Sequence, residues 1–300
     1  MALALAEIVQ IAGPLGPLSG ELIGVEGAEH VVVIIPGSGP TDRDGNSPQT
    51  SLNSNSYKML AEGLAANDIT TLRIDKRGLF GSEGAIADPN DVTIAHYAQD
   101  VRDWMERANE LAPRVWIAGH SEGGLVALVA AQVPLDGLQG LILMATPGRP
   151  VGQHFREQMR ANPNNAALIP EVDAIVAELE AGRTRDAALM PPPIQAMFSN
   201  AVQPYMIDLF SYDPAAIAGR WTGPTLIVQG DADIQVKPLD ADLLAARLPI
   251  ADRAELCGAT HMLKMDVPGQ SLATYTDPAL PLHADLIPEI TKFLHRDSNR

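Results

Sequence analysis

The sequence predicts an α/β fold: a mostly parallel, eight-stranded sheet with helices on both faces and a helical cap inserted between two strands. Three observations predict it. Short runs rich in β-branched residues alternate with longer helical patterns over most of the chain, which is typical of a parallel sheet covered on both faces. The run Val31–Ile35 is continuously apolar, as expected for a central strand. The alternation stops between about Thr146 and Gly223, where prolines are frequent and β-branched runs are few.

The expected elements follow one another in the order that such a sheet requires. Each strand is a short apolar run, and each helix is a longer stretch whose apolar residues recur at helical spacing. We expect strands at Glu7–Ala12, Gly20–Val25, His30–Ile35, Thr70–Asp75, Arg114–Ala118, Leu138–Met144, Thr225–Gln229 and Arg253–Cys257. We expect helices at Tyr57–Ala66, Ile94–Glu110, Glu122–Gln132, Leu239–Arg247 and Ala284–His295.

The proline-rich stretch predicts an insertion and not a second sheet, because its readable segments, such as Glu171–Glu180, are helical. We therefore divide the chain of 300 residues into one core, formed by residues 1–146 and 224–300, and a helical cap at residues 147–223. A chain of this length can bury enough surface to fold without disulfides or structural metals.

The composition excludes several classes of function. With 21 Lys and Arg against 37 Asp and Glu, the net charge is −16, which argues against nucleic-acid binding and against an electrostatic anchor on anionic lipid. Hydrophobic residues make up 46% of the chain and charged residues 19%, an ordinary globular balance. The single cysteine, Cys257, excludes an internal disulfide and any thiolate-rich metal site.

The start of the chain, MALALAEIVQIAG, is apolar but lacks a positive n-region and is interrupted by Glu7, so we interpret it as a strand and not a signal peptide. No apolar run approaches the roughly 18 residues of a membrane span. The cytoplasm is therefore the expected compartment.

One motif carries the chemistry. Gly119-His120-Ser121-Glu122-Gly123 matches G-x-S-x-G, with an expected strand before it and a helix after it. Such a sharp turn holds the serine in a strained backbone conformation and exposes its hydroxyl, and the flanking glycines avoid collisions. The side chain of His120, next to the serine, should point elsewhere. The alternative is an ordinary turn with a serine N-cap, but we predict Ser121 to be a nucleophile.

A serine hydroxyl needs an imidazole base that is itself oriented by a carboxylate. When the serine occupies such a turn, the acid and then the base follow it along the chain. His261 is the only one of seven histidines in a loop directly after a late strand, and we predict it to be the base, with His283 as a rival. For the acid we predict Asp233, and Asp231 in the same turn is the alternative. If Asp231 is not the acid, we expect it to form the turn and support the loop.

Acyl transfer also needs N–H donors aimed at the developing oxyanion. The residue after the nucleophile supplies one of them, here the N–H of Glu122. The second should come from the loop Pro36–Pro40, where glycines let the backbone approach a substrate. We predict the N–H of Ser38, with Gly39 as the alternative; a purely structural turn is the other interpretation.

In combination, these motifs resemble those of the α/β-hydrolases, and more narrowly of bacterial serine carboxylesterases with a GSGPTDRDGN-type oxyanion loop. That loop is intact at Gly37–Asn46 and is joined by Asp75–Gly78, by Gly119–Gly124 and by Gly230–Asp233. The resemblance implies a serine esterase with an eight-stranded core, a helical cap and no cofactor. By position it also implies Ser121, Asp233 and His261 as the triad.

Two positions depart from the pattern of the family, and one charged segment needs an interpretation. Phe80 stands where such sequences commonly have a second glycine, and Thr260 stands where the residue before the base is often Asn. We expect the first to reshape a loop near the site and the second to alter hydrogen bonding around the base. For the charged segment Asp42–Asp44 we favour ion pairs that lock the loop over contact with a substrate.

The cap poses the question of specificity. Its methionines and aromatic residues could line an apolar acyl pocket, although most of them are expected simply to pack its helices. These residues are Met159, Met190, Met197, Met206, Phe198, Tyr205 and Phe210, with Met144 or Met262 to complete the pocket. No basic cluster suggests a phosphorylated carrier such as coenzyme A.

The sequence thus predicts a serine carboxylesterase that hydrolyses small to medium, largely neutral esters through an acyl-enzyme intermediate. We expect no cofactor, and we expect a small-molecule ester as its substrate. A thioesterase, an amidase or peptidase with the same triad, and a non-catalytic hydrolase-like binding protein are the alternatives.

Overall fold

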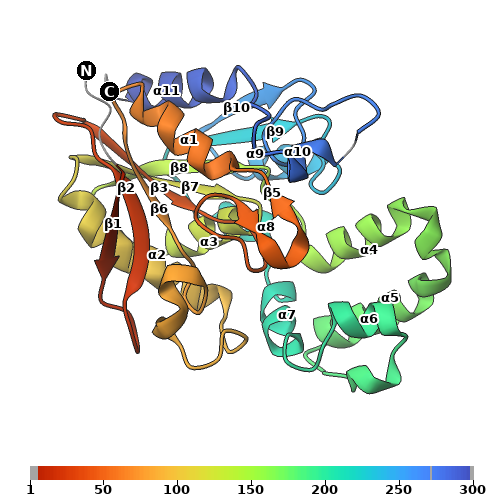
Figure 1. The fold of residues 1–300 in the computed structure, drawn as a ribbon. Coiled ribbons are helices and arrows are strands. Elements are labelled where there is room, and N and C mark those ends of the chain that lie inside the picture. The colour runs from red at the N-terminus through yellow and green to blue at the C-terminus, as the bar shows by residue number, and fades with distance from the viewer. Residues whose placement is uncertain (1–5, 271, 298–300) are drawn as a thin grey trace.

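The computed structural model describes residues 6–270 and 272–297, so the apolar residues 1–5 at the start of the chain lie outside the described part. All eight expected strands form one sheet, in the order β1-β2-β6-β3-β7-β8-β9-β10 (Figure 1). Their bounds are β1 Ala6–Ile11, β2 Leu18–Ile23, β3 His30–Ile35, β6 Thr70–Ile74, β7 Arg114–His120, β8 Leu138–Met144, β9 Thr225–Gly230 and β10 Ala251–Leu256.

The sheet is parallel from β6 to β10, whereas β2 runs antiparallel to both of its neighbours, β1 and β6. The central strand β3 shows why its sequence is apolar throughout. Val31, Val33 and Ile35 join the hydrophobic core on one face, while Val32 and Ile34 join the core on the other. Because side chains alternate along a strand, only a strand covered on both faces buries all of them.

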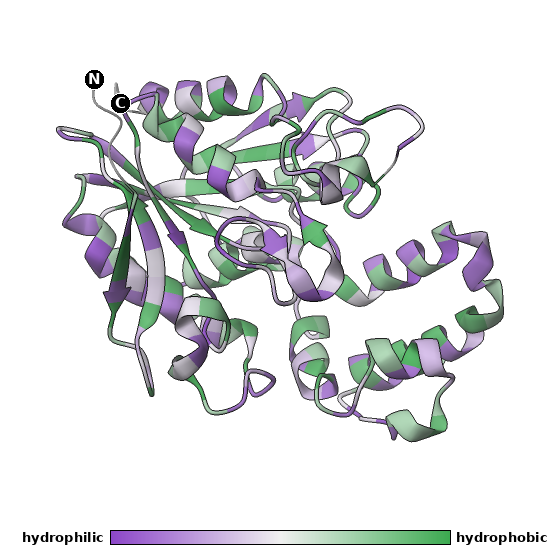
Figure 2. Ribbon diagram, in the orientation of Figure 1, coloured by the Kyte–Doolittle hydropathy of each residue, from purple (hydrophilic) through white to green (hydrophobic). Residues whose placement is uncertain are grey.

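Two layers of helices supply that cover. Helices α1 and α11 lie over one face, and α2, α3 and α9 lie over the other (Figure 1). Along α2 and α11 hydrophobic and hydrophilic residues are interspersed (Figure 2), so each of these two helices presents one apolar side to the sheet. Helix α3 is apolar after Glu122 and is buried over nearly its whole length. Their bounds are α1 Ser56–Ala65, α2 Ile94–Asn109, α3 Glu122–Ala130, α9 Pro238–Ala245 and α11 Leu286–Asp297.

The chain between β8 and β9 is helical, and α4 to α7 pack mainly on one another beside the core (Figure 1). We refer to α4 to α8 as the helical insertion. The last of its helices, α8, packs on α3 and α9 of the core. The bounds are α4 Val151–Ala161, α5 Ile169–Glu180, α6 Pro192–Met197, α7 Gln203–Phe210 and α8 Pro214–Ala218.

Three short elements were not expected from the sequence. The two-residue strands β4, Asn46–Ser47, and β5, Leu52–Asn53, pair at the end of the loop that begins at Gly37, and α10, Ala273–Thr276, follows the loop of His261. They are too short to leave a periodic pattern in the sequence. Within the described residues, no helix combines the length and the apolar character that a membrane crossing requires.

A buried aspartate ties the helical insertion to the core. Asp240 on α9 accepts hydrogen bonds from the Gly148 N–H at 3.1 Å and from the Nε and Nη2 of Arg149 at 3.0 and 2.9 Å. The Nε2 of His154 on α4 lies 3.1 Å from the same carboxylate, and the Lys237 N–H donates to it at 3.1 Å. Burial raises the pKa of Asp240, but His154 and Arg149 outweigh that effect, so its pKa lies well below the ordinary value.

We expect Asp240→Asn to lower the free energy of unfolding by about 3 kcal/mol near pH 7, because it leaves Arg149 without its buried partner. Urea unfolding measures the change. The matched control is Asp242→Asn on the same helix, which loses only a half-exposed pair with Arg253 and should cost less than about 1 kcal/mol.

The same aspartate sets a pH dependence. A carboxyl group whose pKa is lowered in the folded state stabilises the fold fully above its unfolded pKa, and that contribution is lost as the pH falls toward the folded pKa. The difference between wild type and Asp240→Asn should therefore be constant above about pH 5 and shrink below pH 4. A difference that grows on acidification would contradict this assignment.

Candidate active site

Ser121 lies at the sharp turn between β7 and α3, where its backbone adopts φ 53° and ψ −121°. This conformation is strained for a residue other than glycine. The flanking glycines are required by contact: a Cβ on Gly119 would lie 2.2 Å from the Gly123 oxygen, and one on Gly123 would lie 2.5 Å from the Ile35 oxygen. The turn therefore holds Ser121 where the sequence predicts an exposed nucleophile, at the carboxyl end of a central strand.

The predicted base and acid are in contact. His261 Nδ1 lies 2.8 Å from Asp233 Oδ2, and both side chains are buried. Asp233 Oδ1 accepts the N–H groups of Gln235 at 2.7 Å and Val236 at 3.0 Å. Burial raises the pKa of Asp233, but His261 and these N–H groups bring it below the ordinary value, so the carboxylate is ionised at neutral pH. It therefore accepts the proton on Nδ1 and leaves Nε2 of His261 free to accept another.

The two alternatives lie elsewhere. Asp231 is exposed and accepts the Gly258 N–H at 2.5 Å. This contact supports the loop, which is the role expected of Asp231 if it is not the acid. His283 Nε2 contacts the Cys257 carbonyl oxygen at 3.1 Å. Neither residue lines the cavities at Ser121.

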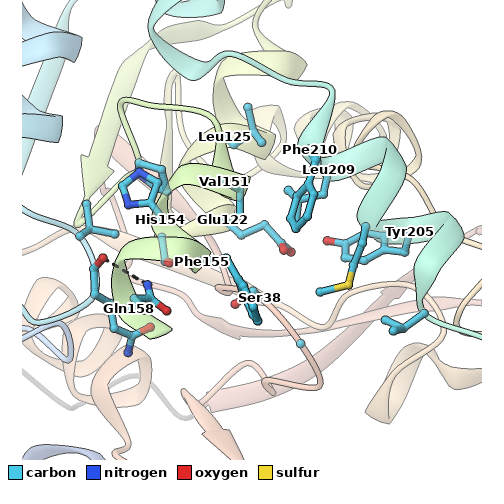
Figure 3. Close-up of a pocket in the computed structure, with 17 residues that line it drawn as sticks. Ser38, Glu122, Leu125, Val151, His154, Phe155, Gln158, Tyr205, Leu209 and Phe210 are labelled. Carbon is cyan, nitrogen blue, oxygen red and sulfur yellow. Dashed lines mark hydrogen bonds between the residues drawn. The ribbon is translucent and has the colours of Figure 1, made fainter. Parts of the chain in front are cut away.

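Two cavities meet at Ser121, and Ser38, Ser121 and Gln235 line both of them. The first, of about 340 Å³, lies beneath α4 and α7 and is lined by Glu122; we call it the insertion-side cavity (Figure 3). The second, of about 360 Å³, is lined by His261, and we call it the base-side cavity. The predicted nucleophile thus has one cavity on the side of Glu122 and one on the side of His261. Among the described side chains, none hydrogen-bonds the Ser121 hydroxyl.

The insertion-side cavity is largely apolar. Of the residues expected to line an acyl pocket, Tyr205, Met206 and Phe210 do so. Phe155 and His154 on α4 also line it, and no sequence signal distinguished them from packing residues. Met262 lines the base-side cavity. The remaining candidates, Met144, Met159, Met190, Met197 and Phe198, pack into the hydrophobic core.

A polar group forms part of the wall of the insertion-side cavity. The carboxylate of Glu122 and the hydroxyl of Tyr205 point toward each other (Figure 3). Burial, and the nearby carboxylate, raise the pKa of Tyr205. Lys76 Nζ lies 3.4 Å from Glu122 Oε1 and donates to the Gly37 carbonyl oxygen at 2.6 Å. Lys76 therefore contacts both segments that hold the predicted oxyanion donors.

The expectation that His120 points away from the site is wrong. His120 lines the base-side cavity, and its Nε2 contacts the His261 carbonyl oxygen at 2.8 Å. Because a carbonyl only accepts, Nε2 carries the proton. Burial lowers the pKa of His120 to about 3, so Nδ1 is unprotonated and accepts the Tyr57 hydroxyl at 2.8 Å. Tyr57 in turn accepts the Gly37 N–H at 3.1 Å, which connects the loop Pro36–Pro40 to the loop of His261.

We expect Tyr57→Phe to lower kcat/KM for p-nitrophenyl butyrate at least about tenfold and the free energy of unfolding by about 1–3 kcal/mol, because two buried groups lose their partner. Steady-state kinetics and urea unfolding measure the two effects. Tyr212→Phe, which removes a hydroxyl outside both cavities, is the control and should change neither. A Tyr57→Phe enzyme with wild-type kinetics would show that this connection does not position the site.

The charged segment Asp42–Asp44 forms ion pairs that hold its loop in place, as expected. Arg43 Nη2 lies 3.1 Å from Asp75 Oδ2, and Asp44 pairs with the buried Arg73. Phe80 keeps the left-handed conformation that glycine would favour there, with φ 49°. The Thr260 hydroxyl donates to the Thr274 hydroxyl at 3.0 Å, and this contact supports the loop of His261.

The fold is that of a known protein family. Residues 32–273 match the model of the alpha/beta hydrolase family. The chain belongs to this family. It is 26% identical over 270 residues to Esterase EstD of Thermotoga maritima, an alignment that covers 88% of this chain but only 61% of that protein.

Solved structures share the fold of this alpha/beta hydrolase. Est1E of Butyrivibrio proteoclasticus, solved with ferulic acid bound, superposes with a TM-score of 0.62 at 19% identity, over 97% of this chain and 100% of that one. The Pyrococcus furiosus esterase Pf2001 superposes with a TM-score of 0.63 at 14% identity, over 98% of this chain and 91% of that one. At these identities the similarity establishes the fold.

Proposed function

We propose that this hydrolase is a serine carboxylesterase that acts on largely neutral esters. Ser121 attacks the ester carbonyl, and His261 takes the proton of Ser121 and returns it to the oxygen of the leaving alcohol. Asp233 orients the imidazole and stabilises its charged form. Water then attacks the acyl-enzyme by the same route and releases the acid.

The observation that carries the proposal is the contact of His261 with Asp233 beside a cavity that Ser121 also lines. The N–H groups of Ser38 and Glu122 are the proposed oxyanion donors, and both residues line the insertion-side cavity with Ser121. Residues 147–223 would serve as a cap whose α4 and α7 cover the acyl group. The relationship to esterases such as EstD supports the same reaction.

A panel of matched acyl donors tests this function. Butyryl esters of p-nitrophenol and methanol, butyryl-CoA and a butyryl anilide carry one acyl group on three kinds of leaving atom. We expect kcat/KM to be highest for the esters. Faster cleavage of the thioester or of the amide would overturn the carboxylesterase assignment in favour of a thioesterase or an amidase.

A fluorophosphonate probe separates a catalyst from a hydrolase-like binding protein, because the probe labels only an activated serine. We expect wild type to be labelled at Ser121. Absence of labelling in the folded protein would contradict the proposal.

A further inference from the structure

We propose that the base-side cavity binds the alcohol part of the ester, and that this alcohol is uncharged and carries several hydroxyl groups, as in an ester of glycerol or of a sugar. The inference rests on the proposed esterase function and adds the class of alcohol that the site prefers. It follows from the position of His261 and from the side chains that line the two cavities.

The position of the base determines which cavity receives the alcohol. In ester cleavage one imidazole must reach the serine oxygen first and the leaving oxygen afterwards. His261 lines the base-side cavity and does not line the insertion-side cavity. The leaving oxygen, and the alcohol attached to it, must therefore lie in the base-side cavity. The acyl chain is left with the insertion-side cavity, whose walls include Val151, Phe155 and Leu209.

The lining of the base-side cavity suits hydroxyl groups. Ser38, Ser121, Tyr57, His120 and His261 line it and already have roles or partners described above. Its other polar side chains are five hydroxyl groups and one amide. Its large apolar residues are Leu52, Met262 and Leu272. Within the part of the chain that the structure describes, no Lys, Arg, Asp or Glu lines it. The hydroxyl and amide residues are Thr41, Thr50, Ser51, Gln235, Tyr275 and Thr276.

Several of these groups already form one hydrogen bond within the protein and can still form another with a ligand. Thr41 Oγ1 donates to the Ser38 carbonyl at 2.9 Å, and Thr276 Oγ1 donates to the Leu272 carbonyl at 3.2 Å. Each hydroxyl oxygen therefore remains an acceptor. Gln235 Nε2 donates to the Tyr275 hydroxyl at 3.1 Å, which leaves the tyrosine proton to be donated. A ligand with hydroxyl groups, which both donate and accept, satisfies this mixture, whereas a charged group finds no counterion.

The depth of the residues also fits such an alcohol. Of the lining residues, Thr41 and His261 are buried, whereas Thr50, Ser51 and Thr276 are exposed. The esterified oxygen would lie near His261, and the other hydroxyl groups of the alcohol would extend toward the exposed threonine and serine side chains. An open mouth admits an alcohol that is part of a larger molecule.

Transfer to added alcohols tests the site separately from acyl binding. p-Nitrophenyl butyrate forms the same butyryl-enzyme in every reaction, and glycerol or 1-propanol then competes with water for it. The alcohol gives its proton to His261 and forms a bond to the acyl carbon, while the bond to Ser121 breaks and its oxygen takes the proton. Because the two alcohols have the same three-carbon chain, the ratio of their transfer rate constants reports the additional hydroxyl groups.

We expect glycerol to react at least about tenfold faster per primary hydroxyl group than 1-propanol, which is about 1.4 kcal/mol. Glycerol 3-phosphate should react more slowly than glycerol. Tyr275→Phe and Thr276→Val should each lower the glycerol-to-propanol ratio at least about threefold. The matched controls Tyr212→Phe and Thr222→Val, which lie outside both cavities, should leave the ratio unchanged.

A ratio near one, or a ratio insensitive to the substitutions at Tyr275 and Thr276, would overturn the inference while the enzyme remained an esterase. Faster transfer to glycerol 3-phosphate than to glycerol would overturn the preference for an uncharged alcohol. Failure to release p-nitrophenol at all would instead overturn the proposed function, and this inference with it.

Discussion

Replacing Ser121 by alanine is expected to lower kcat for p-nitrophenyl butyrate by roughly 10⁴- to 10⁶-fold. The substitution removes the oxygen that forms the acyl-enzyme and leaves the N–H groups of the site in place. Alanine at φ 53° carries the same backbone strain as serine, so we expect little change in stability. Steady-state kinetics give the loss, and circular dichroism with urea unfolding shows that the fold is retained.

Ser38→Ala is the matched control, because the proposed oxyanion donor at that position is the backbone N–H and not the hydroxyl. We expect it to cost less than about tenfold in kcat, since the N–H is retained. Wild-type labelling of Ser121→Ala by a fluorophosphonate would show that another residue is the nucleophile.

The second large effect is expected at Asp233. Asp233→Asn should lower kcat by about 10⁴-fold, because an amide can donate to His261 Nδ1 and so favours the wrong tautomer. Asp231→Asn should cost less than about tenfold, since Asp231 only accepts the Gly258 N–H. The measurement is kcat for p-nitrophenyl butyrate with each variant. A larger loss at Asp231 than at Asp233 would reverse the assignment of the acid.

Local sequence was sufficient for much of the fold. Most of the strands are short runs rich in apolar and β-branched residues. From β7 to β10, strands that follow one another along the chain also lie next to one another in the sheet. The turn at Ser121 is equally local, because the glycines that permit it lie two residues to either side of it. His261 and Asp233 could be chosen because parallel strands bring the loops that follow them to one edge of the sheet.

The supporting contacts could not be predicted, because they join residues far apart in the chain. Tyr57 and His120 meet across 63 positions, and Arg149 and Asp240 across 91. In the sequence, nothing distinguishes any of these four residues from an ordinary polar side chain. The lining of the insertion-side cavity posed a similar difficulty: Met206 faces the cavity and Met197 faces the core, although both lie on short helices of the insertion. Only the packing of those helices decides between the two.

The contact of Lys76 with the Gly37 oxygen has a consequence for the hydrogen-bond strength of the proposed oxyanion donor, the N–H of Ser38. That oxygen and the N–H of Ser38 belong to one planar trans peptide, in which the two groups point in opposite directions. The ammonium that holds the oxygen therefore also sets the direction of the N–H. It draws electron density through the conjugated amide toward the oxygen and makes that N–H a more acidic donor. A cation buried behind the loop would thus polarise the proposed oxyanion donor without occupying the space of the substrate.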